Sequence, residues 1–204
     1  MQNNVKEFLY QNIIAFLVIS LFTFINPGET VPFIGNMIWL QIGAVSLCYL
    51  LFGYKVFLGS LIAVIFTAHD FSFDLERFYD ISEMFGHFVG AFSPLFAIIS
   101  MKFFKLSNFF EGSKLIFQHL IFLGILTAFY NTILTFFVYS YFEIKSDGSM
   151  VEPFSFIKNY LLGDILGSLI VLFFAALVVV PGIRYFAPNL VPSEDESIST
   201  IIFS

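Results

Sequence analysis

Charged residues are scarce in this chain. Asp, Glu, Lys and Arg make up 12% of its 204 residues, and Lys and Arg together number only 9. A soluble domain needs more charge to cover its surface, and a nucleic-acid interface needs clustered basic residues. Both classes are therefore excluded. The single cysteine, Cys48, lies in an apolar run, so no disulfide framework can form within the chain.

Sequence motifs of enzymes are missing as well. The chain has no phosphate-binding glycine loop, no H-E-x-x-H zinc motif and no G-x-S-x-G nucleophile turn. The acidic stretch 69–83, "HDFSFDLERFYDISE", lacks the short, regular spacings of metal ligands. Its pattern is typical of the solvent-exposed face of an interfacial helix. We therefore expect no catalysis, no metal and no cofactor.

Apolar residues are abundant instead. They form 58% of the chain, and its mean hydropathy is +0.90, which is typical of an integral membrane protein. We predict an all-α, polytopic bundle of about six transmembrane helices, with one domain over 1–182 and an acidic cytoplasmic tail over 183–204. Only "GYKV" separates the second span from the third, which predicts a tight helical hairpin. The predicted spans are about 9–25, 36–53, 55–68, 84–102, 115–140 and 156–180.

Basic residues are distributed unevenly between the two predicted sides of the membrane. The richer side carries Lys6, Lys55, Lys102, Lys105, Lys114 and Arg184, and the other carries Arg77 and Lys145. The positive-inside rule then places both termini in the cytoplasm. The N-terminal apolar stretch has no cleavage site, so we expect it to remain as the first helix. The expected location is a bacterial inner (plasma) membrane, with the lipid bilayer as the main partner.

An aspartate interrupts the last predicted span, "YLLGDILGSLIVLFFAALVVVP". Asp164 costs about 2.5 to 3.5 kcal/mol of insertion free energy, which the apolar residues of the span offset with about 4 to 8 kcal/mol. Gly163 and Gly167 form a small-xxx-small pair beside it, which favours close approach of another helix. The Asp164 face is therefore expected to point into the bundle.

Other spans carry polar residues at matching depths. Gln41, with Trp39 near it, His87 and Asn131 all fall with Asp164 in the outer half of the predicted bundle. Four convergent polar groups predict a small-ligand pocket lined by these five residues. The alternative is structural, because intramembrane Gln and Asn often only hydrogen-bond neighbouring helices, at about 0.6 kcal/mol each. Asp164 itself could be a buried structural partner of His87, Asn131 or Tyr160.

Several short motifs resemble the first-type membrane-associated sensor (MASE) domain family. In the stretch 37–66 the matching residues are Trp39, Gly43, Gly53, Lys55, Leu58 and Gly59. The string "FGHFVGAFSPLFAIISMKFFK" is similar to the helix of that family that ends in basic residues, and "YLLGDILG" resembles its closing Gly-Asp-x-x-Gly helix. The resemblance covers most of the chain after about residue 36. The departures are Leu40 and Leu172 in place of Pro, and His87 and Gly90 in place of Asn and Glu.

The resemblance implies a sensor domain that binds a small ligand and signals through its last helix to a cytoplasmic or membrane signalling partner. An ionised Asp164 would favour a cationic or hydroxyl-bearing ligand, and a protonated one would donate a hydrogen bond. Two other functions use the same residues. One is a small-molecule transporter or a substrate-binding transporter subunit, and the other is a structural subunit of a membrane complex.

Overall fold

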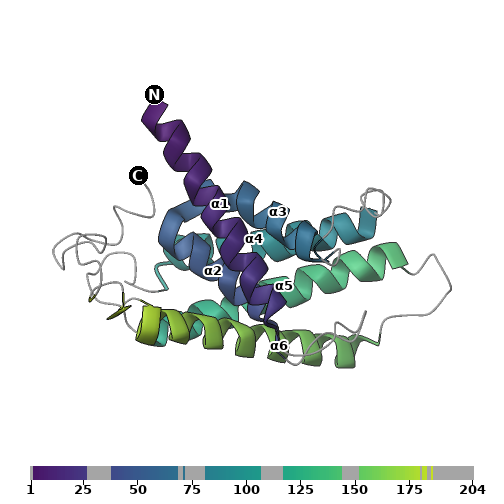
Figure 1. The fold of residues 1–204 in the computed structure, drawn as a ribbon. Coiled ribbons are helices and arrows are strands. Elements are labelled where there is room, and N and C mark those ends of the chain that lie inside the picture. The colour runs from purple at the N-terminus through teal and green to yellow at the C-terminus, as the bar shows by residue number, and fades with distance from the viewer. Residues whose placement is uncertain are drawn as a thin grey trace.

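The structure, a computed structural model, describes residues 2–26, 38–68, 71, 81–106, 117–143, 152–179, 181–182 and 185. Every regular element in these ranges is helical (Figure 1). A 3-10 turn, η1 (Gly53–Val56), joins the second helix to the third, and a π-helical turn, η4 (Ala175–Val179), extends the last. The α-helices are α1 (Gln2–Phe24), α2 (Leu40–Phe52), α3 (Phe57–Ala68), α4 (Ile81–Phe103), α5 (Phe117–Glu143) and α6 (Pro153–Phe174).

The bundle is built around α2, α5 and α6. Helix α5 packs between α4 and α6, and α2 packs along α6 and also contacts α1 and α4. Helix α3 lies against α1 and α4. Tyr49 of α2 is fully buried and donates a hydrogen bond to the carbonyl of Ala91 in α4 at 2.8 Å, which ties α2 to α4. Helix α1 runs obliquely to α6, and its N-terminal end extends beyond the other helices (Figure 1).

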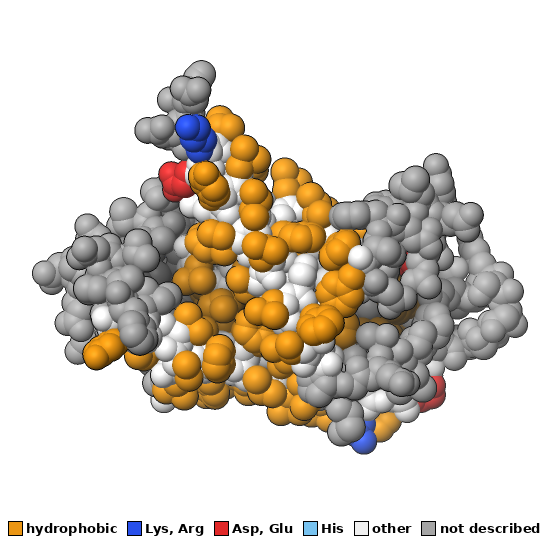
Figure 2. Space-filling view, viewed as in Figure 1, with side chains coloured by type: hydrophobic (Ala, Val, Ile, Leu, Met, Phe, Trp, Pro, Cys, Tyr) orange, Lys and Arg blue, Asp and Glu red, His pale blue; other side chains and the backbone are white. Residues whose placement is uncertain are grey.

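Five segments are long and apolar enough to cross a membrane: Val5–Phe24, Leu40–Ala68, Ile81–Phe103, Gln118–Phe142 and Pro153–Val179. Apolar side chains cover the middle of the face in Figure 2, and the charged ones that it colours lie at the edges. Such a surface is compatible with contact to lipid tails. The prediction of a multi-pass, all-helical membrane protein is therefore confirmed at this level.

The third predicted span is not a separate long helix. Gln41, near the start of Leu40–Ala68, hydrogen-bonds Thr67, near its end, at 2.7 Å, so α2 and α3 fold back on each other as the expected hairpin. Their 13 and 12 residues make helices only about 18 to 20 Å long, whereas the hydrocarbon core is about 30 Å thick. At the turn, Gly53 has φ 69°, a conformation that glycine adopts readily.

Helix α1 and the residues directly after it hold both ends of this hairpin. At the turn, the Asn12 side chain donates to the carbonyl of Lys55 at 3.0 Å and accepts from the amide of Gly59 at 2.7 Å. At the open end, the Asn26 side chain accepts from the amide of Leu40 at 2.7 Å. The two asparagines thus form hydrogen bonds with backbone groups that would have no hydrogen-bond partner in lipid.

Some predicted features lie outside the described residues. They include the tail 183–204 apart from Tyr185, and most of the acidic stretch 69–83. Four of the basic residues used for orientation lie there too. A count of six spans and the placement of both termini in the cytoplasm therefore stay predictions. The four basic residues that lie outside the described part of the chain are Arg77, Lys114, Lys145 and Arg184.

Candidate functional site

Asp164 pairs with Asn131 in the interior of the bundle. The Asn131 side chain donates from Nδ2 to Oδ2 of Asp164 at 2.7 Å, from α5 to α6. Asp164 is 1% exposed and Asn131 6% exposed, so neither faces lipid. A hydrogen bond to a carboxylate is stronger than one between neutral groups, and more so in a low dielectric. The pair therefore fixes the contact between α5 and α6.

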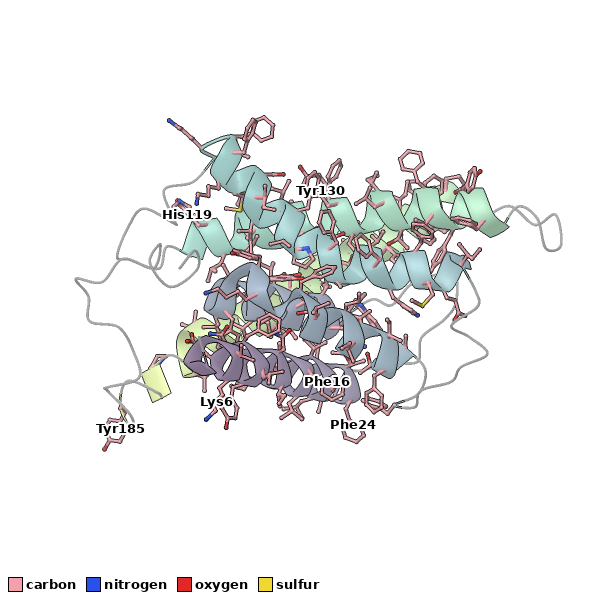
Figure 3. The ribbon with its side chains drawn as sticks, turned by 90° about the horizontal axis from the view of Figure 1, so that it is seen from above. Lys6, Phe16, Phe24, His119, Tyr130 and Tyr185 are labelled. Atoms are coloured by element: carbon pink, nitrogen blue, oxygen red, sulfur yellow. The ribbon has the colours of Figure 1, made fainter. Side chains whose placement is uncertain are left out.

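The pair lies near the middle of both helices. Helix α5 has 27 residues, which at 1.5 Å each makes it about 40 Å long, with Asn131 about 20 Å from either end. In Figure 3, His119 marks one end of α5 and Tyr130, next to Asn131, lies near its middle. The pair therefore lies about midway along both helices, and its predicted place in the outer half of the membrane stays a prediction.

Helix α2 begins at the same turn of α6. The amide of Trp39 donates to the carbonyl of Gly163 at 3.0 Å, one residue before Asp164. A methyl group added at Gly167 would collide with the backbone carbonyl of Trp39, and one added at Gly43 would lie 2.7 Å from the carbonyl oxygen of Gly167. The glycines of this seam therefore let the backbones of α2 and α6 touch, as in other small-residue interfaces. The main chain of Trp39 is next to the Asp164 turn, and its side chain is half-buried.

Gln41 belongs to a different cluster. Its Nε2 donates to Oγ1 of Thr23 at 3.0 Å and to Oγ1 of Thr67 at 2.7 Å, so it joins α1, α2 and α3. Because α2 is held to α6 two residues earlier, Gln41 lies at nearly the same depth as Asp164 but faces the other way. No described contact joins Gln41 to Asp164 or Asn131. The spacing of polar residues along the sequence indicates the level of Gln41 along the bundle. It does not indicate which neighbouring helices its side chain faces.

His87 is displaced along the bundle from the Asp164–Asn131 pair. Its neighbour Gly86 lies opposite Tyr139, since a methyl group there would sit 3.1 Å from the Tyr139 hydroxyl. Tyr139 follows Asn131 by two turns of α5, which corresponds to about 12 Å along the helix. His87 is half-buried in α4, and α5 separates α4 from the main body of α6. The structure therefore does not bring His87 into the same layer as Asp164.

Buried hydroxyl groups extend the pair along α5 and α6. Thr127 and Ser168 are each 0% exposed, and their hydroxyl oxygens have no hydrogen-bond partner; Oδ1 of Asn131 has none either. Thr127 lies one turn before Asn131, and Ser168 one turn after Asp164. The sequence shares these helix faces between many small polar residues and gives no reason to prefer Thr127 and Ser168. What distinguishes them is that each lies one helical turn from a member of the Asn131–Asp164 pair, on the same face of its helix.

Within the described residues, no group of three or more His, Cys, Asp or Glu side chains could hold a metal ion. The acidic stretch 69–83, considered as a metal loop, lies mostly outside the described residues. Asp164 is the only carboxylate in the buried part of α5 and α6, and its hydrogen-bond partner, the Asn131 amide, is neutral.

Comparison with protein-family models, with curated proteins and with solved structures gave no match in any of the three. The resemblance to the MASE family therefore stays a prediction that depends on the quoted motifs alone.

Proposed function

We propose that this chain is a sensor-type membrane domain without catalytic activity, which binds a small ligand at Asp164 and Asn131 and signals through α6. The observation that carries the proposal is the buried Asn131–Asp164 hydrogen bond of 2.7 Å. An ionisable residue inside a membrane bundle is costly and usually marks a binding or transport site. Here its amide partner is on another helix, so a ligand that engages either group changes how α5 and α6 contact each other.

Helix α6 connects this site to the C-terminal end of the chain. Gly163, one residue before Asp164, holds the start of α2, so a shift of this turn moves α2 and α6 relative to each other. Three turns after Asp164 the helix changes to a π-helical turn, Ala175–Val179. Such turns are frequent at functional sites. In the proposed orientation this end faces the cytoplasm, where a signalling partner would bind.

The test is native purification followed by mass spectrometry of bound small molecules and partner proteins. We expect a small molecule to co-purify with the unchanged protein and to be absent from an Asp164→Asn protein of normal fold. Gln41→Leu is the matched control, because it removes a buried polar residue at the same depth and should keep the ligand. Equal ligand content in all three proteins would contradict the proposal. The resemblance to the MASE family implies a histidine kinase or a cyclic-dinucleotide enzyme as the output module, so either one co-purified would identify the signalling partner.

A second candidate is a small-molecule transporter or a transporter subunit. It is favoured by the position of the Asp164–Asn131 pair midway along α5 and α6, because secondary transporters hold substrate and coupling ions near the middle of the bilayer. Uptake of a labelled solute by proteoliposomes, lost in the Asp164→Asn protein, would favour this candidate over the sensor. Ligand binding without uptake would favour the sensor.

A further inference from the structure

Helices α5 and α6 run antiparallel with a register that aligns four polar side chains. Asn131 meets Asp164, and further along a methyl group added at Gly124 would lie 3.4 Å from Cβ of Ser168. Thr127 lies between Gly124 and Asn131 on the same face of α5. Ser168 lies one turn from Asp164 on α6, because residues four apart share a helix face. Thr127 therefore lies on α5 between the Asn131–Asp164 contact and the Gly124–Ser168 contact.

Three oxygen atoms beside the Asn131–Asp164 contact have no hydrogen-bond partner. The Asn131 amide nitrogen donates to Asp164, which leaves its Oδ1 without a partner. The hydroxyl oxygens of Thr127 and Ser168 are also without partners, and both side chains are fully buried. Unpaired polar groups are costly in a low-dielectric interior, and lipid cannot pair with them. One bound species that contacts all of these oxygens would satisfy them together.

The chemistry of these groups indicates a positively charged species. The site contains one carboxylate, one amide oxygen and two hydroxyl oxygens, which are the hard ligands that alkali and alkaline-earth cations prefer. Helix α5 contains no Lys or Arg, and the only one in α6, Lys158, is exposed and six residues from Asp164. No described basic side chain of these two helices therefore neutralises Asp164. One carboxylate balances one positive charge, whereas a divalent ion would leave an excess charge in the membrane interior.

We infer that Thr127, Asn131, Asp164 and Ser168 bind a dehydrated alkali-metal cation between α5 and α6. The inference builds on the proposed site at Asp164 and names the class of its ligand or co-ligand. Sodium and potassium share this chemistry, and the structure favours neither. The bound ion would bridge the two helices through oxygens from both, so its arrival or departure changes the contact that the proposed signal uses.

The test is thermal unfolding of the purified protein in NaCl, in KCl and in choline chloride at the same ionic strength. We expect one of the alkali salts to raise the midpoint of unfolding saturably, whereas choline is too large to enter. Trp39 is the only tryptophan of the chain, and its main chain contacts α6 beside Asp164, so its fluorescence gives a second, local readout. Equal midpoints and equal fluorescence in all three salts would overturn the inference.

Variants show whether the ion binds at these residues. Thr127→Val and Ser168→Ala each remove one oxygen, and we expect each to raise the half-saturating ion concentration about tenfold, because a lost ligand is worth roughly one hydrogen bond to a charge. Asp164→Asn should abolish the response. Thr132→Val is the control, because Thr132 is also buried in α5 with an unpaired hydroxyl but is turned about 100° from Asn131.

An ion response that is unchanged in Thr127→Val and Ser168→Ala would overturn the site even if Asp164→Asn failed to fold. The inference and the proposed function can also fail separately. A small organic molecule bound by the unchanged protein and lost in Asp164→Asn, with no ion response, would overturn the cation and keep the sensor. An ion response without any ligand or partner would keep the cation and remove support for the sensor.

Discussion

Two buried polar clusters lie at nearly the same level along this bundle and differ in their ionisable groups and in how completely they are hydrogen-bonded. The first joins α1, α2 and α3 through the side chain of Gln41, which reaches Thr23 and Thr67. It is neutral, and both threonines also bond within their own helices, to the carbonyls of Ile19 and Ala63. The second joins α5 and α6 through Asp164 and Asn131, and it contains a carboxylate.

The difference between the clusters shows how to separate structural from functional polar residues in a membrane core. In the Gln41 cluster the amide donor has two acceptors, so it stabilises the α1–α2–α3 contact and leaves no donor on Gln41 for a ligand. In the Asp164 cluster three oxygens remain without partners. A buried polar group therefore indicates a site only where the surrounding protein leaves its hydrogen-bonding capacity unused.

The largest effect is expected at the seam that holds the two clusters together, in Gly167→Ala. The new methyl group would overlap the backbone of Trp39 and lie 2.9 Å from the amide nitrogen of Leu40. The backbone of Trp39 cannot move aside as a flexible side chain can. We therefore expect the free energy of unfolding to fall by about 3 kcal/mol, at the upper end for overpacking. Thermal unfolding in detergent measures it. Gly90→Ala is the matched control: its nearest neighbour is 3.8 Å away, and it should be neutral or stabilising.

The next effect separates stability from binding at the charged cluster. Asn131→Leu removes the hydrogen-bond partner of Asp164 that the structure shows, and we expect it to cost about 2 kcal/mol, the range for a bond to a charged group. The double variant Asn131→Leu with Asp164→Leu should recover most of that loss, since a buried polar pair can be replaced by apolar residues with little cost. Ligand and ion responses should be absent from both. Recovery of binding together with stability would show that the pair is structural.

A smaller effect is expected in the neutral cluster. Gln41→Leu removes two intramembrane hydrogen bonds, each worth about 0.6 kcal/mol, so the loss of stability should be about 1 kcal/mol. Both threonines keep their bonds to their own helices, which limits the cost. The ion and ligand responses at Asp164 should be unchanged. If Gln41→Leu abolishes either response, the two clusters are coupled and the distinction between them is wrong.

Sequence predicted the helical membrane class, the hairpin and the buried face of Asp164, because hydropathy and small-residue spacing act locally. It grouped Gln41 and His87 with Asp164 because depth along a helix can be counted from residue numbers. Rotation and the choice of neighbouring helix cannot be counted in this way. They depend on which backbones approach, as α2 and α6 do at Gly167, and on asparagines such as Asn12 that pair with distant backbone groups.

The smallest effect concerns a second carboxylate, Glu152, which directly precedes α6. Glu152 is exposed, whereas Asp164 is buried. It caps the N-terminus of the helix by accepting from the amides of Phe154 at 3.2 Å and Ser155 at 2.6 Å. Hydrogen bonds from the side chain and amide of Ser155, and from the amide of Phe154, lower the pKa of Glu152. Because the pKa is lowered on folding, the cap contributes fully above the ordinary pKa of a glutamate and is lost as pH falls through the lowered value.

Amide hydrogen exchange at Ser155 measures this cap, with Glu152→Ala as the variant. At neutral pH the variant should exchange faster than the unchanged protein, because the first turn of α6 has lost its acceptor. As the pH falls below the lowered pKa, the two proteins should converge, since a protonated Glu152 is a weaker acceptor. Exchange around Asp164 should not change, because the effect of a cap is confined to the first turn. Faster exchange there would show that the two carboxylates of α6 are linked, and Glu152 would then belong to the signalling path of the helix rather than only to its end.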